Sequence, residues 1–239
     1  MTGTYGTRCL GADLAACESE ARQRGATYAN LAVLFADSPS EVVLSTLVGV
    51  VGSTEGDAAG MEGLRAYFDG QRDGIDESLR CAVASEYADL FVGPRPPQAP
   101  MYESVYLGTP KRLFTEQTML VRHFYARCGL AVVKSDKVPD DYLPYELELI
   151  SSLALREADA AGRGDVRGAD EARELQLEFL RAHLGRWMEP FSCRVIQAES
   201  SDFYAALVAF ARDFIADDET YLAHSVDEAG MSVTEGALR

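Results

Sequence analysis

Four acidic residues stand close together at Asp140, Asp141, Glu146 and Glu148. Paired carboxylates are the residue types that acid-base catalysis uses, so one interpretation of this cluster is a small acidic active site. The same pattern is typical of a helix start, where an aspartate caps the first turn and glutamates near the positive end of the helix dipole face solvent. A cap and a ligand-binding acid are compatible roles, and both interpretations stay open on the residues alone.

Other residue types that support catalysis or metal binding are sparse. The sequence contains no phosphate-binding Gly-x-x-x-x-Gly-Lys-Ser/Thr loop, no Gly-x-Gly-x-x-Gly, no His-Glu-x-x-His and no Gly-x-Ser-x-Gly. The histidines His123, His183 and His224 lie far apart, which disfavours a histidine-rich metal site. His183, close to Trp187, fits a core or interface position. The five cysteines are widely spaced and odd in number, which predicts reduced thiols in a reducing compartment.

A proline-rich stretch over residues 93–104 separates two helical patterns. Four prolines, from Pro94 to Pro100, fall within seven residues, and they can neither continue a helix nor enter a sheet interior. The loop is therefore predicted to be stiff and extended. One interpretation is a bare connector, after which Glu103 and Ser104 begin the next element. The other is a binding wall that presents Pro100, Tyr102 and Tyr106 as rigid apolar surface.

Two motifs resemble the signature of the TorD-type family of cytoplasmic chaperones, whose members bind twin-arginine signal peptides and the apoenzymes of molybdopterin oxidoreductases. The family's Tyr-x-x-Leu-Phe-x-Gly-Pro and Pro-x-x-Glu-Ser-x-Tyr are matched here by Tyr87, Leu90, Phe91, Gly93, Pro94, Pro100, Glu103, Ser104 and Tyr106. Its Pro-Asp-His-Leu-x-x-Glu-Leu is matched, with one residue of slack, by Pro139, Asp140, Leu143, Glu146 and Leu147. A third, weaker similarity runs from Phe179 through His183 to Trp187 and includes Phe203-Tyr204. The resemblance extends from about residue 27 to residue 217.

The resemblance implies an all-helical, non-enzymatic chaperone that needs no cofactor of its own. It favours the binding wall, and it implies that the motif residues, with Tyr102 and Asp141, contact the signal peptide or client. In that arrangement the apolar residues provide affinity, while Asp140, Asp141 and Glu146 orient the arginines, whose planar fork matches carboxylates. The sequence differs from the family's motifs at two notable positions. Arg95 replaces a family glycine, and Asp141 replaces a family histidine in the region linked to nucleotide binding in some relatives, which disfavours a nucleotide here.

The charge balance limits the kinds of partner. Lysine and arginine number 22 against 38 aspartates and glutamates, a formal net charge of -16, which argues against nucleic acid and anionic membrane surfaces and favours a cationic partner. No basic segment followed by an apolar one opens the chain, and no apolar run reaches the ~20 residues of a membrane helix. A cytoplasmic location is the resulting prediction.

Apolar residues at three- and four-residue steps predict an all-α chain of about nine to eleven helices. One domain is predicted over residues 12–224, with halves at 12–92 and 105–224, a hinge at 93–104, and loose ends at 1–11 and 225–239. Ser38 is expected to cap the second helix, Gly25 to divide the first, and Asp140 or Asp141 to cap the helix that ends near Gly162. Later helices are expected at 169–184, 187–198 and 201–215, and no strand of useful length is expected.

The leading hypothesis is a dedicated maturation chaperone. It binds the twin-arginine leader or the apo form of a molybdopterin oxidoreductase subunit, delays export and aids cofactor insertion. Two alternatives remain: a small nucleotide-binding or acidic-site enzyme, and a structural assembly subunit. The protein is expected to be a monomer or a domain-swapped homodimer.

Overall fold

The computed structural model describes residues 9–53, 61–69, 75–94, 96–109, 112–133, 138–198 and 202–236. Within these ranges it contains helices and one isolated β-bridge, with no strand, which confirms the all-α prediction. In chain order the elements are α1 (Cys9–Ala36), α2 (Glu41–Ser53), α3 (Met61–Asp69), α4 (Glu77–Tyr87), a π-helical turn η1 (Ala88–Val92), α5 (Glu103–Leu107), α6 (Glu116–Arg127), α7 (Leu143–Gly162), α8 (Val166–Ala182), α9 (Leu184–Gln197) and α10 (Asp202–Gly236).

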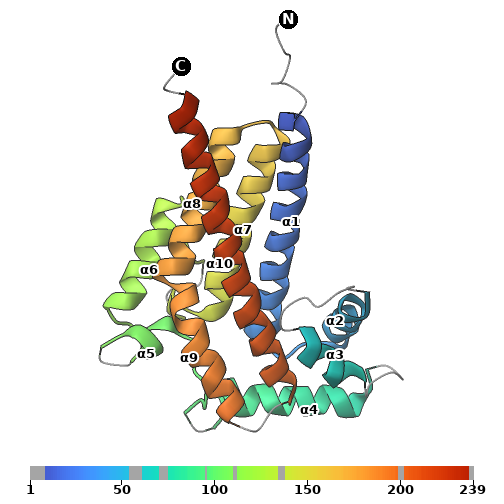
Figure 1. Ribbon diagram of the computed structural model, residues 1–239. Coiled ribbons are helices and arrows are strands. Elements are labelled where there is room, and N and C mark those ends of the chain that lie inside the picture. The colour runs from blue at the N-terminus through green and yellow to red at the C-terminus, as the bar shows by residue number, and fades with distance from the viewer. Residues whose placement is uncertain are drawn as a thin grey trace, which may run out of the picture.

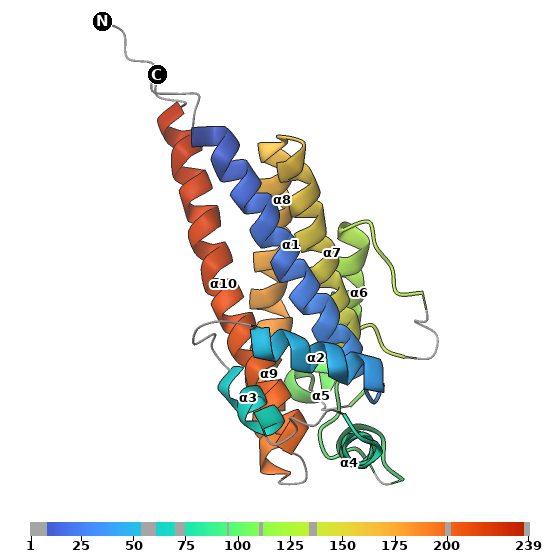
Figure 2. The ribbon, with the colours of Figure 1, turned by 90° about the vertical axis from the view of Figure 1, so that its right-hand side faces the viewer.

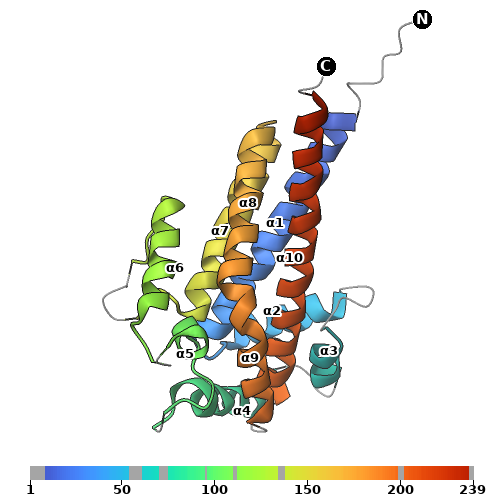
Figure 3. The ribbon, with the colours of Figure 1, turned by 60° about the vertical axis from the view of Figure 1, so that its left-hand side comes forward.

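The long helices α1, α7, α8 and α10 form a bundle, with α6 beside it and the short helices α2 to α5 gathered at one end (Figures 1, 2 and 3). Helix α1 packs along α7, far away in the sequence. At their contact a side chain on Gly25 would meet Ala154 and Leu155 at 3.4 Å, and the Ser151 hydroxyl donates to the Gly25 carbonyl at 2.8 Å. Gly25 therefore does not divide the first helix as predicted; it allows α1 and α7 to approach closely.

One hydrophobic core joins elements from both sides of the proline-rich loop. Phe35 of α1, Phe91 of η1 and Tyr204 of α10 contact one another, with ring centroids 5.1 to 6.5 Å apart. Such edge-on and tilted pairs are favourable beyond the apolar area that they bury. The two predicted halves thus share a single core, as expected for one globular domain; the hinge role of residues 93–104 stays a prediction.

A network of buried charges crosses the centre of the bundle. Glu157 of α7, fully buried, pairs with Arg24 of α1 and with Arg173 of α8, the latter at 2.7 Å. Arg24 also binds Asp218 of α10 at 2.9 Å, and the Tyr28 hydroxyl donates to the same carboxylate at 2.8 Å. Because removing one partner leaves a buried charge uncompensated, these bonds oppose sliding of the four helices past each other. Helical periodicity in the sequence does not predict this network, because its partners come from four separate helices.

Several helix boundaries differ from the predictions. The second helix starts at Glu41, and Ser40, not Ser38, accepts from an amide of its first turn, that of Val43, at 3.4 Å. Helix α8 begins earlier than residue 169 because Asp165 caps it through the Gly168 amide at 3.0 Å. Helix α10 continues to Gly236, so residues 225–236 are helical where a loose end was expected. Of the loose end expected at 1–11, residues 9–11 belong to α1, and residues 1–8 lie outside the described residues.

Candidate functional site

The two sequence motifs meet in space and are joined through their backbones. Tyr102 and Tyr142 form an antiparallel bridge, and the Leu143 amide donates to the Met101 carbonyl at 3.0 Å. The Glu103 amide donates to the Asp141 carbonyl, also at 3.0 Å. The start of α5 and the start of α7 are therefore held side by side, and we call this contact the motif junction.

Asp141 caps a helix other than its own. Its Oδ2 atom accepts from the Ser104 amide at 2.8 Å, which places a carboxylate at the N-terminus of α5. Helix α7 begins after Tyr142, and no side chain caps it. The prediction that Asp140 or Asp141 caps this helix is therefore wrong, because Asp141 turns toward the neighbouring element and Asp140 pairs with Arg122 of α6.

Behind the junction lies a buried group of polar side chains. Glu103 contacts Nδ1 of His183 at 3.1 Å and accepts from Gln117, while Glu146 accepts from the Trp187 indole at 3.0 Å. Burial, and then the nearby charge of Glu103, raises the pKa of Glu146 well above 4.5. Two enclosed carboxylates beside each other favour holding a proton on one of them. This raised pKa favours the protonated form of Glu146, whose carboxyl group serves as a structural hydrogen-bonding group.

The outer side of the junction carries half-buried aromatic side chains. The Tyr102 and Tyr142 rings lie 5.2 Å apart, and Tyr145 approaches Tyr142 edge-on at 5.3 Å. Tyr106 stacks on Trp187 at 5.4 Å, and burial raises its pKa to about 12. We call Pro100, Tyr102, Tyr106, Tyr142 and Tyr145 the tyrosine ledge; all five are partly exposed, although the hydroxyl of Tyr106 is buried.

The proline-rich loop turns back onto the helix that precedes it. Gly93 has a φ of 50°, in the region that favours glycine, and its amide donates to the Ala88 carbonyl at 2.6 Å. The Ala99 amide donates a hydrogen bond to the Leu90 carbonyl at 3.0 Å, and Ala99 is fully buried. The predicted break at Gly93-Pro94 is confirmed, and the loop packs against the core at Ala99, while Pro94, Pro96 and Gln98 are exposed.

Most of the predicted contact residues are buried. The buried ones are Tyr87, Leu90, Phe91, Glu103, Ser104, Pro139, Asp140, Asp141, Leu143 and Glu146, while Gly93, Pro100, Tyr102 and Tyr106 are partly exposed and Pro94 is exposed. Asp140, Asp141 and Glu146 are thus enclosed and hydrogen-bonded within the chain, and in this conformation their carboxylates do not meet an arginine from outside. Sequence periodicity finds such core positions but does not name their partners across the fold.

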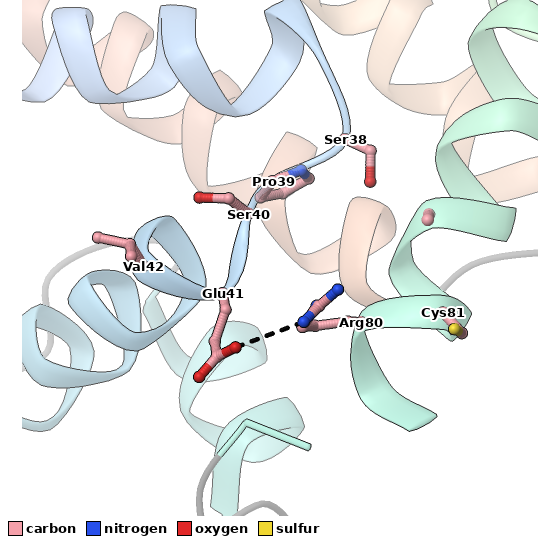
Figure 4. A pocket seen from close by; sticks show the side chains of 8 residues that line it. Ser38, Pro39, Ser40, Glu41, Val42, Arg80 and Cys81 are labelled. Carbon is pink, nitrogen blue, oxygen red and sulfur yellow. Dashed lines mark hydrogen bonds and ion pairs between the residues drawn. The ribbon is translucent and has the colours of Figure 1, made fainter. Parts of the chain in front are cut away.

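Away from the motif junction, a hollow of about 460 Å³ lies between the start of α2 and helix α4 (Figure 4). Glu41 and Arg80 face each other across it at 3.4 Å, the first well exposed and the second partly exposed. An exposed ion pair contributes little, about 0–1 kcal/mol, and the hollow offers no buried polar group that would orient a ligand. It is a weaker candidate than the motif junction.

The described residues form neither a metal site nor a membrane span. No three histidine, cysteine or acidic side chains among them are placed to hold a metal ion. No helix among them has both the length and the apolar character that crossing a membrane requires.

Comparison with known proteins identifies the family. A family model described as "Nitrate reductase delta subunit" matches residues 54–192, more than half of the chain and both motifs. A protein of Haemophilus influenzae named "Probable Tat proofreading chaperone DmsD" is 27% identical over 133 residues, which are 56% of this chain and 58% of that protein. A "Chaperone protein TorD" of Vibrio cholerae is 27% identical over 153 residues, 64% of this chain and 66% of the relative.

A third relative, the "Chaperone protein TorD" of a Shewanella strain, is 28% identical over 152 residues, 62% of this chain and 66% of its own length. The chain thus spans somewhat less than two thirds of the length of each of these three relatives. All three are named as chaperones and none as an enzyme, in agreement with the expectation drawn from the missing catalytic motifs. The chain belongs to the nitrate reductase delta subunit family, the family of TorD- and DmsD-type chaperones that its two motifs indicate.

Proposed function

We propose that this protein is a maturation chaperone for a molybdopterin oxidoreductase subunit, and that it binds the subunit's twin-arginine leader, its apo form, or both. It delays export of the client and keeps it open for cofactor insertion. The observation that carries the proposal is the motif junction, where residues of both family motifs converge beneath one half-exposed aromatic surface. The surplus of acidic residues supports a cationic leader as the partner.

Apolar contact is the larger source of affinity in this proposal. Burying ~400 Å² of apolar peptide surface contributes roughly 10 kcal/mol, from which ordering an unfolded peptide removes about 2–5 kcal/mol. An exposed pair of arginine and carboxylate adds only about 0.2–1 kcal/mol. The half-exposed side chains of the tyrosine ledge, chiefly Pro100, Tyr102 and Tyr106, are the proposed client contacts. The buried Leu90, Phe91 and Leu143 hold the ledge in place.

Calorimetric titration with a synthetic twin-arginine leader tests the proposal. We expect micromolar or tighter binding, weaker when both arginines are replaced by lysine, because lysine lacks the bidentate fork. Tyr102→Ala is expected to weaken binding about tenfold, as the loss of one aromatic anchor does, and Tyr102→Phe to keep it. Absence of binding to either leader, by protein with an intact helical circular dichroism spectrum, would contradict leader binding.

The acidic-site enzyme finds no support in the position of the acids. Glu146 is enclosed, with a pKa that burial raises, and Asp141 is engaged with the backbone of α5. A general base needs to reach a substrate proton, and neither carboxylate has such access in this conformation. No particular contact favours the assembly subunit over the chaperone.

A further inference from the structure

An apolar groove lies on another part of the molecule, between α1, α2, α3 and α10. Its cavity volume is about 380 Å³, within the size range of ligand sites. The floor is formed by buried side chains such as Leu31, Leu64 and Leu207, and the walls by Val33 and Val42, which are 53% and 75% exposed. None of the described residues that line this groove carries a charge.

Helix α2 is the unusual element of the groove. Seven of its thirteen residues are valine or leucine, yet only Leu44 and Val51 are buried. Val42 and Val50 remain well exposed on the groove side. A helix this apolar is normally covered, and large exposed apolar patches mark interaction sites. Figure 2 shows α2 lying across the lower part of α1, beside α3 and the lower part of α10.

The groove has an acidic end. On α10, Phe210 and Phe214 line it, and Asp217 follows on the same helical face, exposed to solvent. On α1, Gln23 lines it, and Glu20 precedes it by one turn. The Tyr221 hydroxyl of α10 donates to Glu20 at 2.8 Å, which places these acids at the same end of the α1–α10 contact. An apolar trough thus leads to two carboxylates.

We propose that this groove binds the apolar run of the leader, with the leader's arginines directed toward Glu20 and Asp217. The inference rests on the proposed function and adds a second contact surface to it. From Gln23 to Leu34 the groove follows α1 for roughly 17 Å, the length of about 11 helical residues. An apolar run of a leader has about 7–15 residues, and the helix-in-groove mode suits this size. A second copy of this chain fits less well, because it brings a net charge of -16 to an acidic end.

The test uses the full-length protein and a synthetic peptide with two arginines ahead of an apolar run of about 12 residues. Val42→Asp is expected to weaken binding at least tenfold, because it places a charge in the apolar trough. Val166→Asp is the matched control, since both valines stand in the first turn of an exposed helix start, where an added carboxylate is tolerated. The control is expected to bind like the wild type. A benzophenone amino acid at Thr46 is expected to cross-link the peptide, and one at Val166 is not.

Each outcome decides between the surfaces. If the wild type binds the peptide and Val42→Asp binds it equally well, without cross-linking from Thr46, the groove is not the site and the chaperone proposal stands. If the wild type binds no leader, the groove inference falls together with the leader-binding part of the proposed function, and binding of the apo form is the part that stands. If Val42→Asp leaves leader binding unchanged but dissociates a dimer in sedimentation velocity, the groove belongs to a second copy and the inference is overturned.

Discussion

At the scale of single residues, Glu146 illustrates how a family position acquires its role. Its carboxyl group is fully buried, accepts from Trp187 and lies beside Glu103. Burial and the Glu103 charge raise its pKa well above 4.5, so the folded state binds this proton more tightly than the unfolded chain. The stability that it contributes is complete below pH 4.5 and is lost as the pH rises through the raised pKa.

Glu146→Gln tests this protonation state. The amide keeps an acceptor for Trp187 and supplies a permanent donor toward Glu103. We expect the variant to match the wild type at about pH 5 and to exceed its free energy of unfolding by about 1–3 kcal/mol at about pH 9. Urea denaturation at the two pH values measures the difference. A variant less stable than the wild type at both would show that Glu146 is ionised in the folded state.

At the scale of elements, the short helix α5 holds Glu103 under the ledge and depends on its ends. Asp141 caps its start. At its end, the Gly108 amide donates a hydrogen bond to the Ser104 carbonyl at 3.0 Å. A side chain on Gly108 would collide with that same carbonyl, whereas Gly129, after α6, has a φ of 72° and open space around it. The two glycines are therefore required for different reasons, space in one case and backbone conformation in the other.

Alanine at each glycine separates these reasons. Gly129→Ala is expected to destabilise by about 1 kcal/mol, the cost of a left-handed conformation. Gly108→Ala is expected to cost more, about 2–3 kcal/mol, because the backbone of α5 must shift. Thermal unfolding shows which of the two variants loses more stability. The fluorescence of Trp187, which lies behind α5, reports a shift of the α5 backbone. Equal effects would mean that α5 adapts without strain.

At the scale of the whole molecule, the acid surplus acts on encounter more than on the final contacts. A net charge of -16 attracts a cationic leader over distances near the Debye length, about 8 Å at physiological salt. Close apolar contacts in the ledge or the groove then determine how long the leader stays. The association rate constant therefore reports the charge attraction, and the dissociation rate constant reports the apolar contacts.

Raising the ionic strength from about 0.05 M to about 0.5 M is expected to lower the association rate constant about tenfold and to change the dissociation rate constant little. Stopped-flow fluorescence with a labelled leader measures both. The same experiment on a leader with neutral residues in place of the arginines is the control and should show a weak salt dependence. If salt instead acted mainly on the dissociation rate constant, ion pairs and not apolar contacts would be what keeps the leader bound.

The sequence by itself determined the helical class, the break at Gly93 and the two family motifs. These are set by apolar spacing and by backbone preferences of single residues, which are local properties. It did not determine that Asp141 caps α5, that Glu103 meets His183, or that Arg24 reaches Glu157 across the bundle. Such partners lie from 37 to 133 positions apart, and only the packing of helices brings them together. Tertiary structure also decided that the motif acids are enclosed while the apolar helix α2 stays open, because burial belongs to the assembled core and not to any one segment.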